Sequence, residues 1–115
     1  MTRAVLYKDA QGLFTGFSVK GHSGYARAGR DIVCAAVSIL TTTCVNALES
    51  VAGVIPTVRG GDDGFLEAML PEALDAQQSH DAQILFGALH QGLSDLTQAY
   101  PKYFELSIHE RREIP

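Results

Sequence analysis

The segment from Ile32 to Val51 constrains the fold more than any other part of the chain, because apolar residues surround most of its circumference when it is drawn as a helix. A helix that is hydrophobic on nearly all sides is a buried helix. We therefore expect a sheet to cover one side of it and another helix or a second subunit to cover the other. Asp31 directly precedes the segment and is a good N-cap, because its carboxylate can accept hydrogen bonds from the first free backbone N–H groups.

Polar residues interrupt this apolar segment. They are Ser38, Thr41, Thr42, Thr43, Asn46 and Glu49. A membrane-spanning helix needs about 20 predominantly apolar residues, and a signal peptide places basic residues before an apolar run at the N-terminus, which this chain does not show. We interpret the segment as a core helix, and we expect no membrane partner and a cytoplasmic location.

The rest of the chain alternates between strand-like and helical patterns. Strands are predicted at Thr2–Lys8, Leu13–Lys20, Val54–Arg59, Phe65–Leu70 and Tyr103–His109, and a second helix within Glu72–Tyr100, starting near Asp75 or Ser79. Pro56 cannot donate to a strand ladder, so the third strand is expected at a sheet edge or bulged. The order ββαββαβ predicts an α/β fold of the layered α+β kind, with a mixed sheet packed against two helices. A chain of 115 residues forms one domain, 1–115.

Charge and cysteine spacing limit the chemistry. The net charge of −4 argues against a phosphate-binding face and so against direct nucleic-acid binding, whereas it suits a basic protein partner. Cys34 and Cys44 lie ten residues apart on one predicted helix, which is about 15 Å and too far for a disulfide. We expect two free thiols, as in a reducing compartment. No Cys-x-x-Cys or His-Glu-x-x-His spacing occurs, so no metal site is predicted.

A glycine-punctuated loop leads into the first helix. The stretch from Gly21 to Ser38 reads Gly-His-Ser-Gly-Tyr-Ala-Arg-Ala-Gly-Arg-Asp-Ile-Val-Cys-Ala-Ala-Val-Ser. Cys34 becomes the third helical residue, where unpaired N–H groups and the helix dipole favour a thiolate. His22 lies on a loop that is flexible enough to fold back toward Cys34. A thiol at a helix N-terminus with an imidazole free to reach it is the arrangement that nucleophilic catalysis needs. The alternative is a small buried cysteine and a histidine that merely ends a strand.

This stretch resembles the ribosomal-processing cysteine proteases, the Prp or YsxB-like family of Firmicutes and related bacteria. The family pattern is Gly-His-(Ala/Ser)-Gly-x-Ala-x-x-Gly-x-Asp-(Ile/Leu)-Val-Cys-Ala-(Ala/Gly)-Val-Ser. The matching residues are Gly21, His22, Ser23, Gly24, Ala26, Gly29, Asp31, Ile32, Val33, Cys34, Ala35, Ala36, Val37 and Ser38. The length and order of elements are also similar, so the resemblance covers nearly the whole chain.

The resemblance implies a cysteine endopeptidase with Cys34 as the nucleophile and His22 as the general base and acid. The family substrate is large-subunit ribosomal protein number twenty-seven, made with a short N-terminal extension that the protease removes. The resemblance also implies a homodimer and a site without cofactor. From the chemistry of the helix start, we expect the backbone N–H of Cys34 to face the developing oxyanion.

The surrounding residues have open interpretations. Asp31 is either a helix cap or a group that orients His22. Ser38 lies one turn from Cys34 and either bonds its own helix backbone or supports the site. Tyr25 either anchors the loop or lines a substrate groove. We expect the loop to be a mobile lid over the substrate, with the loop residues Gly21, Ser23, Gly24, Tyr25 and Gly29.

A competing function is a module without catalysis. A glycine-rich loop that runs into a helix N-terminus can bind an anion or a peptide, and a ribosome-associated structural protein is a further alternative. The stretch lacks the Gly-Lys-Ser/Thr ending of a phosphate loop and the Gly-x-Gly-x-x-Gly spacing of a dinucleotide site. These departures favour the protease interpretation.

Overall fold

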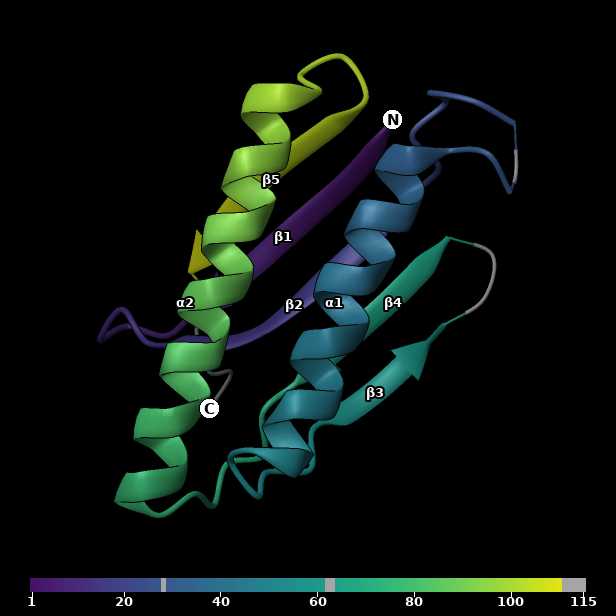
Figure 1. Cartoon of the computed structure of the whole chain (residues 1–115). Coiled ribbons are helices and arrows are strands. Elements are labelled where there is room, and N and C mark those ends of the chain that lie inside the picture. The colour runs from purple at the N-terminus through teal and green to yellow at the C-terminus, as the bar shows by residue number, and fades with distance from the viewer. Residues whose placement is uncertain (28, 62–63, 111–115) are drawn as a thin grey trace.

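The computed structural model describes residues 1–27, 29–61 and 64–110, so Asp62 and Asp63 of the glycine-rich turn lie outside the described residues. The elements are β1 (Thr2–Lys8), β2 (Phe14–Lys20), α1 (Ile32–Ser50), β3 (Thr57–Gly60), β4 (Phe65–Met69), α2 (Ala76–Ala99) and β5 (Phe104–Glu110). Figure 1 shows their arrangement. The observed order is ββαββαβ, which confirms the predicted mixed α and β fold.

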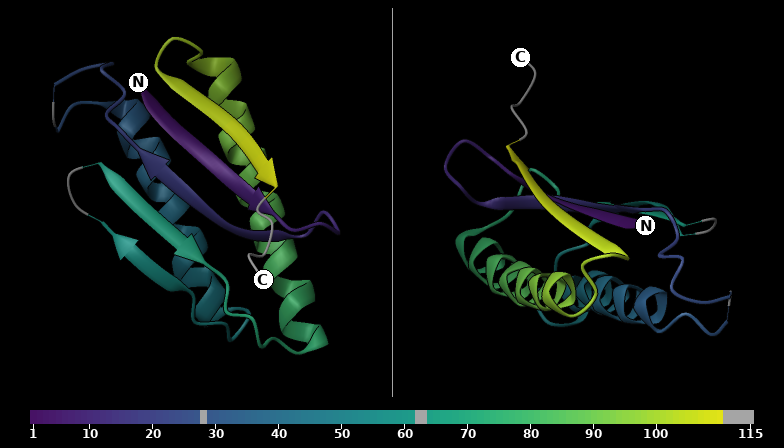
Figure 2. Two further views of the ribbon diagram at one scale, coloured as in Figure 1. Left: turned by 180° about the vertical axis from the view of Figure 1, so that it is seen from behind. Right: turned by 90° about the horizontal axis from the view of Figure 1, so that it is seen from above.

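The strands form one five-stranded mixed sheet in the order β3-β4-β2-β1-β5. β1 pairs antiparallel with β2, with Leu6 opposite Phe17, and parallel with β5, with Leu6 opposite Ile108. β4 pairs antiparallel with β2 on the side away from β1, and β3 pairs antiparallel with β4 at the edge of the sheet. Both helices cover the same face of the sheet, so the molecule has two layers and the other sheet face is open (Figure 2).

The core lies between the sheet and the helices. Alternate residues of each strand point to the same face, so one side of the sheet supplies apolar side chains to the helix layer. The buried apolar residues from the strands are Ala4, Leu6, Phe17, Val19, Ala68 and Phe104, and those from the helices are Val33, Val37, Cys44, Leu48, Ala82, Phe86, Leu89, Leu93 and Leu96. These contacts fix α1, and with it the position of its first turn.

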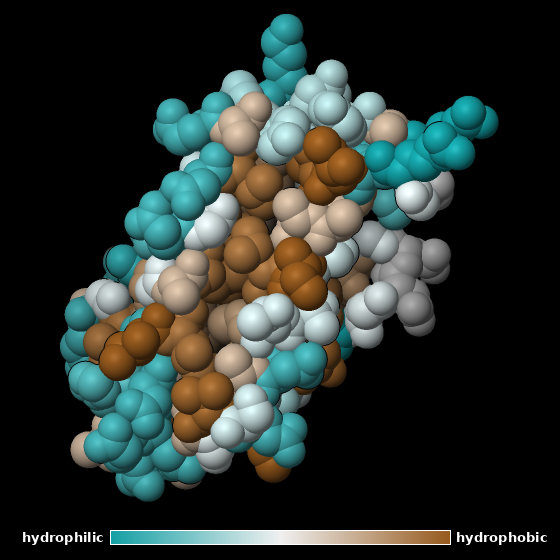
Figure 3. All heavy atoms as spheres, viewed as in Figure 1, coloured by the Kyte–Doolittle hydropathy of each residue, from teal (hydrophilic) through white to brown (hydrophobic). Residues whose placement is uncertain are grey.

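The outward face of the helix layer stays apolar and exposed. Ile39 on α1 is 64% exposed and Ile84 on α2 is 58% exposed. Figure 3 shows hydrophobic atoms gathered along the middle of this face, between the two helices. By length and composition α1 is apolar enough to cross a membrane, with a mean hydropathy of 1.6, but Val33, Val37 and Leu48 are buried in the domain core. The sheet and α2 therefore cover only part of α1.

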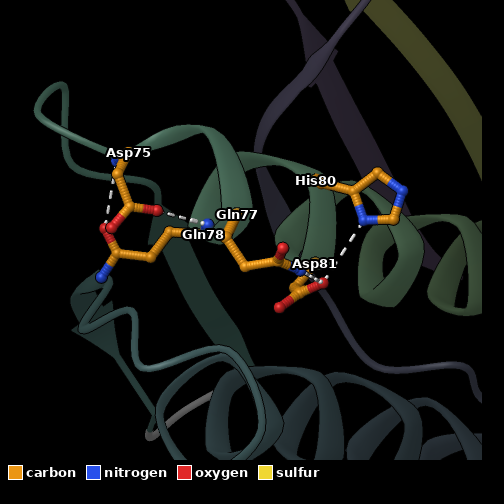
Figure 4. A network of polar contacts seen from close by, with 5 residues as sticks. All are labelled: Asp75, Gln77, Gln78, His80 and Asp81. Atoms are coloured by element: carbon orange, nitrogen blue, oxygen red, sulfur yellow. Dashed lines mark hydrogen bonds and ion pairs between the residues drawn. The ribbon is translucent and has the colours of Figure 1, made fainter.

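The second helix begins at a capping box, as its sequence predicts near Asp75. Asp75 Oδ1 accepts the Gln78 backbone N–H at 2.8 Å, and Gln78 Oε1 accepts the Asp75 N–H at 3.1 Å (Figure 4). Two free donors are satisfied reciprocally, which fixes where the helix starts. His80 on the next turn is exposed and contacts Asp81, as expected for a surface histidine.

The predicted third strand is wrong in its boundaries. The sequence predicts Val54–Arg59 with Pro56 inside, but β3 begins at Thr57. Gly53 has a φ of +67° directly after α1, and the Val54 N–H donates to the Leu48 carbonyl at 2.8 Å. These residues therefore finish the helix end rather than pair with β4. The expected edge position is confirmed, since β3 lies at the end of the sheet.

Candidate active site

The site lies where β2 leaves the sheet and α1 begins. Gly21 follows the last residue of β2 with a φ of +93°, a conformation that only glycine adopts at little cost. This turn sends His22 out of the sheet, where its side chain is exposed. Cys34 lies in the first turn of α1 and is half-buried. The core contacts of α1 and the end of β2 thus bring together two residues from separate elements.

Two cavities meet at this pair. The first, of about 300 Å³, lies between α1 and β4 and is lined by Ser38, Thr42 and Phe65 among others. The second, of about 660 Å³, lies beneath the glycine loop and is lined by Gly24, Ala26 and Ile32 among others. His22 and Cys34 line both cavities. An extended ligand that occupied both would pass over the sulfur.

Asp31 ties the loop to the helix start. Its Oδ1 accepts the backbone N–H groups of Val33 and Cys34, both at 3.0 Å, which confirms the predicted N-cap. Its Oδ2 accepts the Ser23 hydroxyl and the backbone N–H of Tyr25 at 3.1 Å. No hydrogen bond or ion pair joins Asp31 to His22 among the residues that the structure describes, so the geometry favours the structural interpretation of this carboxylate.

The Asp31 carboxylate is held in its ionised form. Burial alone would raise the pKa of Asp31, but the hydrogen bonds from the Ser23 hydroxyl and from backbone N–H groups, that of Cys34 first, outweigh it. Together they lower the pKa of Asp31 from 3.8 to about 2. A carboxylate that accepts several N–H and O–H bonds is stabilised in this way. The cap therefore stays charged throughout the neutral range.

Ser23 contacts the sulfur directly. The Ser23 backbone N–H donates to Cys34 Sγ at 3.4 Å, and the thiol donates to Ser23 Oγ at 3.6 Å. An N–H directed at sulfur stabilises a thiolate. The sequence places Ser23 only among the loop residues, and its position next to His22 in the motif is the one signal that points to this closer role.

The expected oxyanion donor is already occupied. The sequence predicts that the Cys34 backbone N–H faces a developing oxyanion, but in the structure it donates to Asp31. Capping uses the same N–H groups that an oxyanion site at the helix start would need. The backbone N–H of Ser23, in contrast, is directed at the sulfur.

His22 and Cys34 share both cavities without a hydrogen bond between them, as far as the described residues show. In free enzymes catalytic hydrogen bonds are often long and tighten only when substrate binds. His22 is exposed. The structure therefore places the two side chains in one site, in contact with the same two cavities.

The remaining predicted residues have clear positions. Gly24 and Gly29 take φ values of +73° and +83°, as expected for a glycine loop. The Tyr25 ring packs edge-on against Tyr100 and Tyr103, with centroids 5.6 and 5.2 Å away. Tyr25 is absent from the lining of both cavities, so the structure favours its anchoring role over groove lining.

Ser38 and Cys44 lie on the same helix as Cys34. Ser38 is exposed in the first cavity, and no hydrogen bond links its hydroxyl to Cys34 or His22 in the described part of the chain. Cys34 and Cys44 are both free, as predicted. Burial raises the pKa of the Cys44 thiol to about 11. Cys44 is thus a core residue.

Comparison with known proteins identifies the family. Residues 1–105 match the family described as cysteine protease Prp. The chain belongs to the Prp family of cysteine proteases. The ribosomal processing cysteine protease Prp of Bacillus subtilis (strain 168) is 30% identical over 101 residues, which are 87% of this chain and 90% of the relative.

Solved structures share the fold of this Prp-family chain. The crystal structure of SMU.848 from Streptococcus mutans is 28% identical, has a TM-score of 0.80 and covers 96% of each chain. The essential ribosomal processing protease Prp from S. aureus, solved with a covalently linked product peptide, has a TM-score of 0.83 at 20% identity, covering 94% of this chain and 99% of that one. The similarity to the S. aureus structure supports the two-layer fold.

Proposed function

We propose that this protein is a cytoplasmic endopeptidase that removes the short N-terminal extension of large-subunit ribosomal protein number twenty-seven, with Cys34 as nucleophile and His22 as general base and acid. The observation that carries the proposal is the meeting of these two side chains at the junction of two cavities, with the sulfur in the first turn of α1. Membership of the Prp family supplies the reaction class.

The chemistry follows from the positions of the groups. The Cys34 thiolate attacks the scissile carbonyl, and the protonated His22 gives its proton to the leaving amine. The Ser23 N–H, already directed at the sulfur, is suited to stabilise the oxyanion. Neutral His22 then takes a proton from water, which attacks the thioester carbonyl; the C–S bond breaks, and the carboxyl product and the Cys34 thiolate are released.

Several features support a peptide substrate and a ribosomal-protein partner. Cys34 lines both cavities, so a peptide chain bound in both would contact this residue. The net charge of −4 suits a basic ribosomal protein. The B. subtilis relative is named for ribosomal processing, and the S. aureus relative was solved with a substrate peptide.

The geometry argues against an anion-binding module at the helix start. The N–H groups of Val33 and Cys34, which would bind the anion, already donate to Asp31. The negative charge of this carboxylate also repels an incoming anion. The alternative of a glycine loop that binds phosphate therefore loses the donors on which it depends.

The direct test is incubation of the protein with the ribosomal protein precursor of its own host, followed by mass spectrometry. We expect a single clipped product with the wild type and none with Cys34→Ala or His22→Ala. Cys44→Ala is the matched control, because Cys44 is buried away from the site, and it should retain cleavage. Cleavage by the Cys34→Ala variant, or an intact precursor with the wild type, would contradict the proposal.

We propose in addition that two copies associate through the outward face of the helix layer. Ile39 and Ile84 are exposed there, and the apolar band between the helices is continuous in Figure 3. Contiguous exposed apolar surface of this kind marks interaction sites. A second copy would cover the side of α1 that the sheet and α2 leave open.

A further inference from the structure

Gly64, directly before β4, contacts Gly21, the first residue of the loop between β2 and α1. The Gly21 N–H donates to the Gly64 carbonyl at 2.8 Å, just before β4 begins. On the other side, the buried Thr2 hydroxyl donates to the Gly21 carbonyl at 3.4 Å. The backbone that carries His22 is thus held by β1 and by the β3–β4 turn, although the turn lies far away in the sequence.

The His22 ring also rests on this turn. A methyl group added at Gly64 would lie 3.1 Å from both Cε1 and Nε2 of His22, and 3.2 Å from the Gly21 carbonyl oxygen. Favourable carbon contacts are longer, at about 3.5–4.0 Å. Only a residue without a side chain therefore leaves the imidazole edge in its present place. The ring makes no hydrogen bond among the described residues, so this contact restrains where its nitrogen lies.

We propose that Gly64 is a positioning residue for the His22 imidazole, and that its lack of a side chain sets the approach of the general base to Cys34. This inference rests on the proposed function of His22. Two demands meet at Gly64: its φ of +71° favours glycine, and the imidazole occupies the space of a side chain. The positive φ affects the stability of the fold, whereas the space occupied by the imidazole affects catalysis.

The test compares Gly64→Ala with Gly12→Ala. Gly12 lies in the β1–β2 turn with a φ of +82°, and a methyl group there has no atom within 4 Å, so it matches the backbone strain without touching the site. Because misplacement by 1 Å costs about 100-fold in rate, a displacement of a few tenths of an ångström should lower kcat of peptide cleavage about fivefold. We expect KM to change little and Gly12→Ala to keep wild-type kcat.

The Gly64→Asn variant distinguishes backbone strain at residue 64 from displacement of the His22 ring. Asparagine tolerates the left-handed conformation better than alanine but carries the same Cβ atom. We expect its melting temperature to recover relative to Gly64→Ala while kcat stays low. A kcat that recovers with the melting temperature, or equal kcat values for Gly64→Ala and Gly12→Ala, would overturn the proposal.

A measurement on the wild type makes the proposal independent of activity. We expect a nuclear Overhauser effect between His22 Hε1 and the Gly64 Hα protons, with the ring signals assigned from a His22→Gln variant. Gly64→Ala should shift the His22 ring resonances and Gly12→Ala should not. Absence of the Overhauser effect would overturn the positioning role even if the precursor is cleaved. An uncleaved precursor would contradict the proposed substrate, whereas the Overhauser effect still tests the contact between Gly64 and the His22 ring.

Discussion

At the scale of single residues, the site depends on one carboxylate that is shared between a helix and a loop. Asp31 caps α1 with one oxygen and binds Ser23 and Tyr25 with the other. Ser23 in turn contacts the sulfur. The position of Cys34 and the conformation of the loop beside it are therefore not independent, because both require the same ionised carboxylate.

This dependence predicts how acid affects stability. The folded-state pKa of Asp31 is about 2, below its usual value of 3.8, so the carboxylate stabilises the fold fully above about pH 4 and this contribution is lost as the pH falls toward 2. It amounts to on the order of 2 kcal/mol. We expect Asp31→Asn to lower the free energy of unfolding at neutral pH, and the difference from wild type to shrink below pH 4, as measured by urea denaturation.

The control for this experiment is Asp95→Asn on α2, an exposed aspartate whose carboxylate accepts the Gln91 amide at 2.9 Å. Exposed substitutions usually change stability by less than about 0.5 kcal/mol. If the Asp31→Asn difference were the same at pH 2 as at pH 7, the charge of the carboxylate would not be what stabilises the fold.

At the scale of elements, the loop between β2 and α1 is anchored at one aromatic residue. The Tyr25 ring contacts Tyr100 and Tyr103, which flank the turn between α2 and β5. The loop is thereby fastened to the opposite end of the chain. Whether it moves as a lid when substrate binds stays a prediction, and the anchor gives a way to test it.

We expect Tyr25→Ala to release the loop and Tyr25→Phe to keep it in place. An edge-on aromatic pair contributes about 0.5–1.5 kcal/mol, so its loss should accelerate limited trypsin cleavage after Arg27 or Arg30 by up to about tenfold. Mass spectrometry of the fragments reports the site of cleavage. Equal cleavage rates for Tyr25→Ala and Tyr25→Phe would show that the ring does not anchor the loop.

At the scale of the whole molecule, two layers are too few to cover α1. The helix has apolar residues on more sides than the sheet and α2 can bury, and Ile39 stays 64% exposed. Exposed apolar area of this kind carries a free-energy cost in water that a partner removes. The sequence predicts cover by a sheet on one side and by another helix or a second subunit on the other. The sheet and α2 leave part of α1 exposed, which fits the proposed dimer.

We expect light scattering after size exclusion to give the mass of two chains for the wild type. Ile39→Lys combined with Ile84→Lys should shift the protein to one chain, because two charges per copy would be buried in the interface. Leu13→Lys is the control, since Leu13 is 43% exposed in the β1–β2 turn and belongs to neither helix. A monomeric wild type, or a double variant that stays dimeric, would contradict this interface.

The sequence alone determined what depends on near neighbours in the chain. The cap at Asp31, the order of elements, the free thiols and the motif with His22 and Cys34 all follow from local spacing and side-chain chemistry, and the structure agrees on the cap, the order and the thiols. The predicted start of β3 is wrong, because the helix end at Gly53 competes with strand pairing for the same residues.

Only the tertiary structure decided which distant groups meet at the site. The contact of Gly64 with His22 and that of Tyr25 with Tyr100 join segments that no periodicity links. Competition for the Cys34 N–H, which Asp31 takes, also became visible only with the backbone in place. Local patterns specify elements, but the register of β4 beside β2 and the packing of α1 on the sheet fix where their ends lie, and the proposed active site lies at those ends.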